Sequence, residues 1–219
     1  MKVLLLGAGS MGRWAAQTAA ALPRVSGLTI ADRNLPAARA LAAQCGPKAE
    51  AMGLDVEDTD ALRSALQEHQ AVLNCVGPYY RFGLPILEAA IGAGCHYLDL
   101  CDDWEPTLDM LRLHDAARAA GITAVIGLGA SPGVSNMLAV QLARSFDQIT
   151  QLHTGWRVES AWTPDPDGKE DSSQAAIEHW VHGFTAPIAV QENGSLQTKA
   201  PWSRSPWRIR GWESGPFIP

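Results

Sequence analysis

The sequence has no hydrophobic run long enough to cross a membrane or to form the core of a signal peptide. Its first apolar run, residues 3–6, ends at Gly7. A signal-peptide core needs about 7–15 apolar residues and a membrane span about 20. We therefore expect a cytoplasmic protein that does not engage a membrane.

Cysteine is scarce, and no C-x-x-C pair is present. The four cysteines are Cys45, Cys75, Cys95 and Cys101. Two of them fall in predicted buried strands, which favours reduced thiols over a disulfide or metal framework. Cys95, His96, Cys101 and Asp102 have the residue types of a zinc site. Their spacing matches no common ligand pattern and neighbouring strand side chains point apart, so no metal is predicted.

Basic residues are also too few and too dispersed for a nucleic-acid surface. The formal net charge is −6, and one short basic cluster lies at residues 204–210. Phosphate backbones favour clustered Lys and Arg, so nucleic acid is not expected as a partner. No G-x-S-x-G or Ser/His/Asp arrangement occurs, which weakens a hydrolase interpretation.

Strand and helix patterns alternate along the first 130 residues. Short apolar runs predict strands over 2–6, 27–31, 49–54, 71–76, 96–100 and 122–126. Amphipathic or Ala-rich segments predict helices over 11–22, 35–44, 59–68, 84–93 and 106–120. This alternation is typical of parallel βαβ units, so we predict an α/β fold, a Rossmann-type doubly wound sheet over residues 1–130.

After residue 130 the pattern changes to that of an α+β domain. We expect a helix to about residue 146, a strand over 149–159, a polar loop over 163–171, a helix over 172–183 and a hairpin over 187–199 around Asn193-Gly194. Residues 201–219 are rich in Pro and Trp and have no clear period. We predict an incomplete α+β substrate and dimerisation domain over 131–219, with an irregular tail.

The motif Gly7-Ala8-Gly9-Ser10-Met11-Gly12 matches G-x-G-x-x-G between a predicted strand and a predicted helix. Gly7 would allow the tight turn, Gly9 the close approach of a pyrophosphate, and Gly12 the packing of helix on strand. Ser10 and Met11 lie at the helix N-terminus, whose free N–H groups attract phosphate. A glycine-rich turn without a ligand is the alternative.

Asp32 ends the second predicted strand, twenty residues after Gly12. A carboxylate there binds the adenosine ribose hydroxyls and repels a 2′-phosphate, which favours NAD. Arg33 can hold that phosphate, so NADP stays open. We expect NAD or NADP, with a slight preference for NAD.

Further cofactor contacts are expected where the third and fourth strands end. Asp55 either touches the adenine ring or caps the helix that begins near Thr59. The segment Asn74-Cys75-Val76-Gly77-Pro78 lies at the carboxyl edge of the sheet, where ligands bind in such folds. Tyr79 and Tyr80 either wall the nicotinamide pocket or pack in a tight loop.

Candidate proton-transfer groups follow the fifth predicted strand. Strand alternation places Tyr97 and Asp99 on one face, and Asp99, Asp102 and Asp103 at or beyond the strand end, facing the mouth of a cleft. Crowded carboxylates raise one another's pKa, which suits a proton shuttle. Asp99, Asp102 and Tyr79 are therefore the catalytic candidates; Asp102 and Asp103 could instead cap the helix near Pro106.

Three segments together resemble the saccharopine dehydrogenase/reductase-like superfamily, which includes lysine 6-dehydrogenase-type enzymes. They are GAGSMG, LNCVGPYYRFGLPILEAAIGAGCHYLDL and AGITAVIGLGASPGVSNMLA, and the resemblance covers about residues 1–145. It implies NAD(P)-linked oxidation of an amine or reduction of an imine without a metal, with Val76, Gly77 and Pro78 on the nicotinamide side. Saccharopine reductases carry an acidic residue where this chain has Ser131, which argues against saccharopine itself.

We also expect a small amino-acid-type amine or imine substrate and a homodimer. Family members are substantially longer, so a cofactor-binding but inactive truncated or sensor protein is one alternative. An enoyl-type reductase is another, because related chains share the VGPY-type loop.

Overall fold

The computed structural model describes residues 1–154, 181–182 and 185–201. The chain forms two compact units, Met1–Ser173 and Gln174–Pro219, which are described separately. The first unit contains a six-stranded, entirely parallel sheet in the order β3-β2-β1-β4-β5-β6. Its strands are β1 Lys2–Leu6, β2 Gly27–Asp32, β3 Ala49–Gly53, β4 Ala71–Asn74, β5 His96–Asp99 and β6 Ala124–Val125. The predicted Rossmann-type α/β fold is confirmed.

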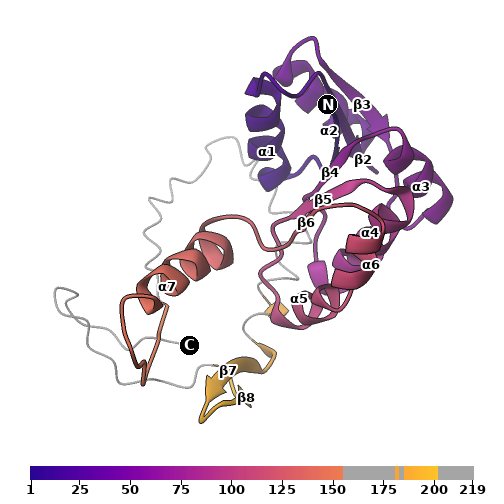
Figure 1. The fold of residues 1–219 in the computed structure, drawn as a ribbon. Helices are drawn as coiled ribbons and strands as arrows, with labels where there is room; N and C mark the ends of the chain where they lie inside the picture. Colours follow the sequence, from indigo (N-terminus) through magenta and orange to yellow (C-terminus); the bar gives the residue numbers. More distant parts are fainter. Residues whose placement is uncertain (155–180, 183–184, 202–219) are drawn as a thin grey trace. The chain divides into compact units, whose positions relative to one another are not determined.

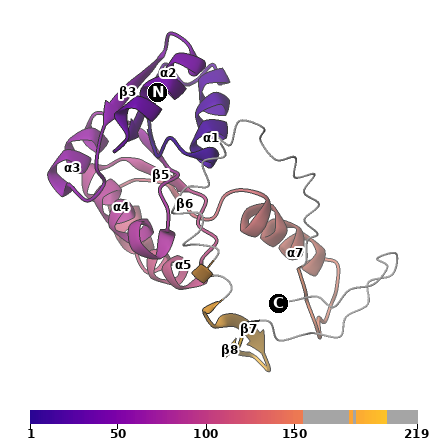
Figure 2. The same ribbon diagram turned by 180° about the vertical axis from the view of Figure 1, so that it is seen from behind.

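The helices of this unit are α1 Ser10–Ala21, α2 Leu35–Cys45, α3 Thr59–Gln67, α4 Tyr79–Ala93, α5 Trp104–Leu111, α6 His114–Ala119 and α7 Ser135–Ala143, with a π-helical turn η1 at Ala130–Val134. Along β1, alternate side chains enter two cores. Val3 and Leu5 pack with α1 and α2, whereas Leu4 and Leu6 pack with α3, α4 and α5. Figures 1 and 2 show these two helix groups on either side of the sheet.

Two predicted helices have different bounds in the structure. α4 begins at Tyr79 rather than residue 84, with Pro78 at its N-cap and Pro85 inside it. The packing of Ile86 and Leu87, both about 1% exposed, offsets the hydrogen bond that Pro85 cannot donate. The single helix predicted over 106–120 is wrong. It is divided into α5 and α6 because the N–H groups of residues 112 and 113 bond to carbonyls three residues back.

The strand predicted over 149–159 is wrong for residues 149–154, which lie in no helix or strand. Residues 155–159, the polar loop over 163–171, the helix over 172–183 except for residues 181 and 182, and the tail over 202–219 lie outside the described residues. The second unit contains the antiparallel hairpin β7 Ile188–Glu192 and β8 Ser195–Lys199. Asn193 and Gly194 both have positive φ at its turn, so the predicted hairpin is confirmed.

Among the described helices, none combines the length and the apolarity that a membrane crossing requires. In the same part of the chain, no three His, Cys, Asp or Glu side chains gather in a way that could hold a metal ion. All four cysteines are free.

Candidate functional site

The carboxyl ends of four neighbouring strands meet at one edge of the sheet. Leu6 pairs with Ala31 on one side and with Asn74 on the other, and Asn74 pairs with Asp99. The glycine-rich loop, Asp32, the 74–78 segment and the 99–103 segment therefore share this edge, as the sequence predicts.

The glycine-rich loop is packed tightly at two glycines and open at the third. A Cβ on Gly7, whose φ is +93°, would lie 2.9 Å from the carbonyl oxygen of Cys75. A Cβ on Gly12 would lie 1.9 Å from the carbonyl oxygen of Gly7. A Cβ on Gly9 would meet nothing within 4 Å. Open space above Gly9 is what a pyrophosphate requires in order to approach the backbone.

The N-terminus of α1 lies at this opening. Gly9 is its N-cap and supplies no side-chain cap, and the first backbone bond to the cap runs from the N–H of Arg13 to the carbonyl of Gly9. The N–H groups of the exposed Ser10 and Met11 thus have no acceptor within the helix. Together with the helix dipole, they make a site that fits a diphosphate.

Asp32 connects this loop to the turn after β2. Its Oδ2 accepts a hydrogen bond from the N–H of Ala8, and its Oδ1 accepts one from the N–H of Asn34, both over 2.7 Å. Each carboxylate oxygen can accept a further bond, so ribose binding is compatible with these contacts. Arg33 is exposed and forms no ion pair within the described part of the chain.

Asp55 does not cap α3, and that alternative is wrong. The N-cap is Asp58, whose side chain accepts from the N–H of Ala61 over 3.0 Å. Asp55 instead accepts from the N–H of Glu57 and is exposed beyond β3. Its contact with an adenine ring stays a prediction.

The side chain of Asn74, the first residue of the 74–78 segment, fixes this segment by hydrogen bonds. The Asn74 side chain is fully buried, its Oδ1 accepts from the N–H of Val76 over 3.0 Å, and its Nδ2 donates to the hydroxyl of Tyr97 over 3.1 Å. The Gly77-Pro78 peptide bond is cis. The Asn74 side chain thus faces the protein interior, and Val76, Gly77 and Pro78 offer backbone toward the edge.

The Tyr79 hydroxyl is already engaged in the loops. It donates to the carbonyl oxygen of Asn74 over 3.0 Å and accepts from the N–H of Leu100 over 3.3 Å. Burial, reinforced by the charges of nearby groups, raises the pKa of Tyr79 above its ordinary value. This ring joins the ends of β4 and β5, and its proposed catalytic role stays a prediction.

Asp99 does not face the mouth of a cleft, and this part of its predicted placement is wrong. Its side chain is 0% exposed, because alternation along β5 turns it inward beside Tyr97. Oδ1 accepts from the N–H groups of Cys101 and Gly127 over 3.1 and 2.7 Å, and Oδ2 accepts from the Tyr97 hydroxyl over 2.8 Å.

The cause expected for a raised carboxyl pKa also needs correction. Burial raises the pKa of Asp99 above its ordinary value, and the three hydrogen bonds oppose the rise. Crowding by other carboxylates is not among the causes. Burial and the charge of Asp99 together raise the pKa of Cys75 to about 12, so this thiol is protonated at neutral pH.

Asp102 and Asp103 line a hollow of about 440 Å³ beside β6 and the 127–133 loop. Trp104, Gly127 and Asn136 also line it. Asp103 is at the N-cap of α5, but its side chain makes no cap hydrogen bond; its carbonyl accepts from Thr107. Asp102 is exposed, so of the predicted catalytic carboxylates it is the one that reaches this hollow.

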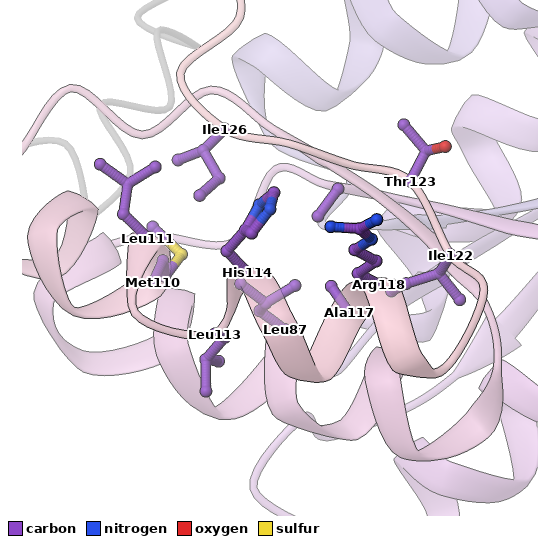
Figure 3. A pocket seen from close by; sticks show the side chains of 11 residues that line it. Leu87, Met110, Leu111, Leu113, His114, Ala117, Arg118, Ile122, Thr123 and Ile126 are labelled. Carbon is purple, nitrogen blue, oxygen red and sulfur yellow. The ribbon is translucent and has the colours of Figure 1, made fainter.

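A second hollow, of about 370 Å³, lies between α4, α5, α6 and β6 (Figure 3). Its walls are mainly apolar, and the side chains of His114 and Arg118 extend beside them. It contains none of the predicted site residues.

The sequence interpretation missed the role of Tyr97 and of Gly127. Strand alternation did place Tyr97 on the face of Asp99, which was the available signal. Gly127 has a φ of +70°, and its N–H binds a residue 28 positions earlier, a contact that no local pattern could reveal.

Residues 3–125 match the family model of the saccharopine dehydrogenase NADP binding domain. The chain belongs to this family. The match confirms the resemblance and indicates a nicotinamide cofactor. Because the family is one of NADP binding domains, the slight preference for NAD is not supported.

Two curated proteins have sequences similar to that of this chain. Carboxyaminopropylagmatine dehydrogenase from Synechocystis sp. is 30% identical over 161 residues, which are 69% of this chain and 40% of that protein. Trans-acting enoyl reductase from Mycobacterium leprae is 30% identical over 147 residues, 65% of this chain and 35% of that protein. The chain thus spans two fifths or less of the length of these relatives.

Among solved structures, the apo saccharopine dehydrogenase (L-Glu forming) from Saccharomyces cerevisiae is similar. Its TM-score is 0.57 at 29% identity, over 66% of this chain and 31% of that one. The predicted domain boundary near residue 130 and the homodimer stay predictions.

Proposed function

We propose that this chain binds NADP(H) and contributes the cofactor half of an oxidoreductase that acts on an amine or an imine. The observation that carries the proposal is the glycine-rich loop, closed at Gly7 and Gly12 and open at Gly9 beneath the N-terminus of α1. The loop would bind the diphosphate through Ser10, Met11 and neighbouring N–H groups.

Recognition of the adenosine end would come from two adjacent side chains. Asp32 would accept from a ribose hydroxyl, while the guanidinium of Arg33 would bind the 2′-phosphate. Arg33 forms no ion pair with another described residue, so binding a phosphate would break no ion pair within the described part of the chain. We place NADP ahead of NAD on this basis and on the family match.

The nicotinamide end would lie against the backbone of Val76, Gly77 and Pro78, with Cys75 behind it. When bound, the nicotinamide supplies or accepts the hydride. Val76, Gly77 and Pro78 would hold the nicotinamide ring in place and exclude water from this edge of the sheet.

The hollow beside Asp102 is the proposed substrate side. Its position next to the 127–133 loop places it at the carboxyl edge of β5 and β6, where ligands bind in open α/β sheets. Asp102 is the preferred proton shuttle, because Asp99 is fully buried and the Tyr79 hydroxyl already has both a donor and an acceptor partner. Residues 131–219 would belong to a substrate and dimerisation domain.

An amine or imine substrate is supported by the dehydrogenases among the relatives. Reduction of an enoyl substrate is the second candidate, supported by the similarity to trans-acting enoyl reductases. A cytoplasmic homodimer is proposed with either activity.

Turnover assays can separate these candidates. NADPH oxidation would be followed with an imine formed in solution from a 2-oxo acid and a diamine, and separately with an enoyl thioester. Imine-dependent oxidation supports the first candidate, and enoyl-dependent oxidation replaces it with the second. NADPH binding without either reaction would support a cofactor-binding chain that catalyses neither of these two reactions.

A further inference from the structure

A buried chain of hydrogen bonds joins the proposed nicotinamide loop to the proposed substrate hollow. It runs from the N–H of Val76 through Asn74, Tyr97 and Asp99 to the N–H of Gly127. The donor–acceptor distances are 3.0, 3.1, 2.8 and 2.7 Å in that order. Asn74, Tyr97 and Asp99 are each 0% exposed.

The Tyr97 hydroxyl is the central member of this chain. It accepts from Nδ2 of Asn74 and donates to Oδ2 of Asp99, so both of these bonds are lost when that one oxygen is removed. The carboxamide of Asn74 and the carboxylate of Asp99 have no access to water. Each would therefore lose a hydrogen-bond partner that water cannot replace.

The two ends of the chain are backbone groups of functional loops. Val76 belongs to the segment proposed to lie against the nicotinamide. Gly127 lines the hollow beside Asp102, and a Cβ on Gly133 would lie 2.9 Å from the carbonyl oxygen of Gly127, so this loop is closely packed. Hydride transfer requires the donor and acceptor atoms to be held about 3–3.5 Å apart and aligned, so the distance between these two loops affects the reaction.

We propose that the Tyr97 hydroxyl is a positioning group that holds the 74–78 loop and the 127–133 loop in a fixed relation. It acts through Asn74 and Asp99 and touches neither cofactor nor substrate. The expected effect on NADPH binding rests on the proposed function. The coupling between the two loops requires no ligand.

The test is Tyr97→Phe in the 219-residue chain, with Thr29→Val as the matched control. Thr29 is also buried, and its hydroxyl also bridges two side chains, His69 and Glu50, away from both loops. Two probes are titrated: NADPH and 2′-phospho-ADP-ribose, which lacks the nicotinamide. Amide hydrogen exchange of Val76 and Gly127 is measured in the free protein.

For Tyr97→Phe we expect NADPH binding to be about tenfold weaker. This loss of binding free energy is similar to the net contribution of one hydrogen bond. Binding of 2′-phospho-ADP-ribose should change less than about twofold, and exchange at Val76 and Gly127 should accelerate together. Thr29→Val should show neither selective effect. Equal weakening of both probes, or unchanged exchange at either loop, would overturn the proposal.

If Tyr97→Phe does not fold, Asp99→Asn serves instead, because it removes an acceptor from the same chain while keeping the size of the side chain. The same selective loss is expected. A wild-type chain that binds no NADPH would refute the proposed function alone, since the exchange of Val76 and Gly127 would still test the coupling.

Discussion

The Tyr97 hydroxyl donates a hydrogen bond of 2.8 Å to Oδ2 of Asp99, and both side chains are completely buried. A carboxylate in this place is removed from water and receives three hydrogen bonds in return. Burial is the larger effect, so the pKa of Asp99 is raised. The stability of the fold should therefore depend on the protonation of this residue.

The first prediction concerns pH and Asp99→Asn. Because the pKa of Asp99 is higher in the folded than in the unfolded chain, the folded chain binds this proton more tightly. Its contribution to the free energy of unfolding is present at low pH and is lost as pH rises through the folded-state pKa. The difference between wild type and Asp99→Asn should thus grow in favour of wild type as pH falls from about 8 toward about 4.

Urea unfolding at several pH values measures this difference directly. Comparison with the variant cancels the titration of other carboxyl groups that both proteins share. A difference that is flat, or that shrinks as pH falls, would show that the pKa of Asp99 is not raised by burial.

The second prediction contrasts two glycines of the same loop. Gly12→Ala should lower the free energy of unfolding by at least about 2 kcal/mol, because its Cβ would lie 1.9 Å from the carbonyl oxygen of Gly7. Gly9→Ala should change stability by less than about 1 kcal/mol, because its φ is −76° and its Cβ would meet nothing within 4 Å. Equal losses in chemical denaturation would contradict the loop geometry.

The third prediction concerns cofactor choice. Arg33→Ser should weaken NADPH binding by about tenfold or more and leave NADH binding nearly unchanged, because only NADPH carries the 2′-phosphate. Asp32→Ser should move the preference further toward NADPH, since a carboxylate repels that phosphate. Arg39→Ser, on the exposed side of α2, is the control for loss of a positive charge. Calorimetric titration measures all three variants, and an unchanged ratio in Arg33→Ser would remove Arg33 from the site.

The fourth prediction concerns the proton shuttle. Asp102→Asn should lower turnover by about 10²-fold or more while nucleotide affinity stays within about twofold, because a general acid or base acts on the chemical step. Steady-state rates with the imine substrate, paired with NADPH titration, make the comparison. Unchanged turnover would exclude Asp102 from this role.

The fold and the cofactor loop were predictable because their signals are local. The spacing of Gly7, Gly9 and Gly12 between a strand and a helix identified the loop without knowledge of the contact that Gly7 makes with Cys75, and the 2.0 and 3.6 residue periods identified the layers. The bounds of the helices were harder to predict from the sequence. Pro85 lies inside α4 because packing of the inward face outweighs the lost hydrogen bond.

The chemistry at the end of β5 was only half predictable. Alternation along the strand correctly placed Asp99 on the same face as Tyr97. It could not predict that the N–H of Gly127 donates a hydrogen bond to Asp99. The orientation of Asn74 toward the interior likewise depends on a hydroxyl 23 residues away. Such long-range contacts follow from the topology of the sheet and not from sequence spacing.

The most direct test of the account is titration of the chain with NADPH and NADH, following nicotinamide fluorescence and tryptophan quenching, alongside Gly9→Ala. Gly9→Ala is predicted to retain the fold and places a methyl group in the open space above the loop, so it tests the diphosphate site separately from stability. We expect saturable binding, with NADPH tighter than NADH, and we expect Gly9→Ala to weaken the binding by about tenfold or more. Absence of binding by the folded wild-type chain, or binding that Gly9→Ala does not weaken, would contradict it.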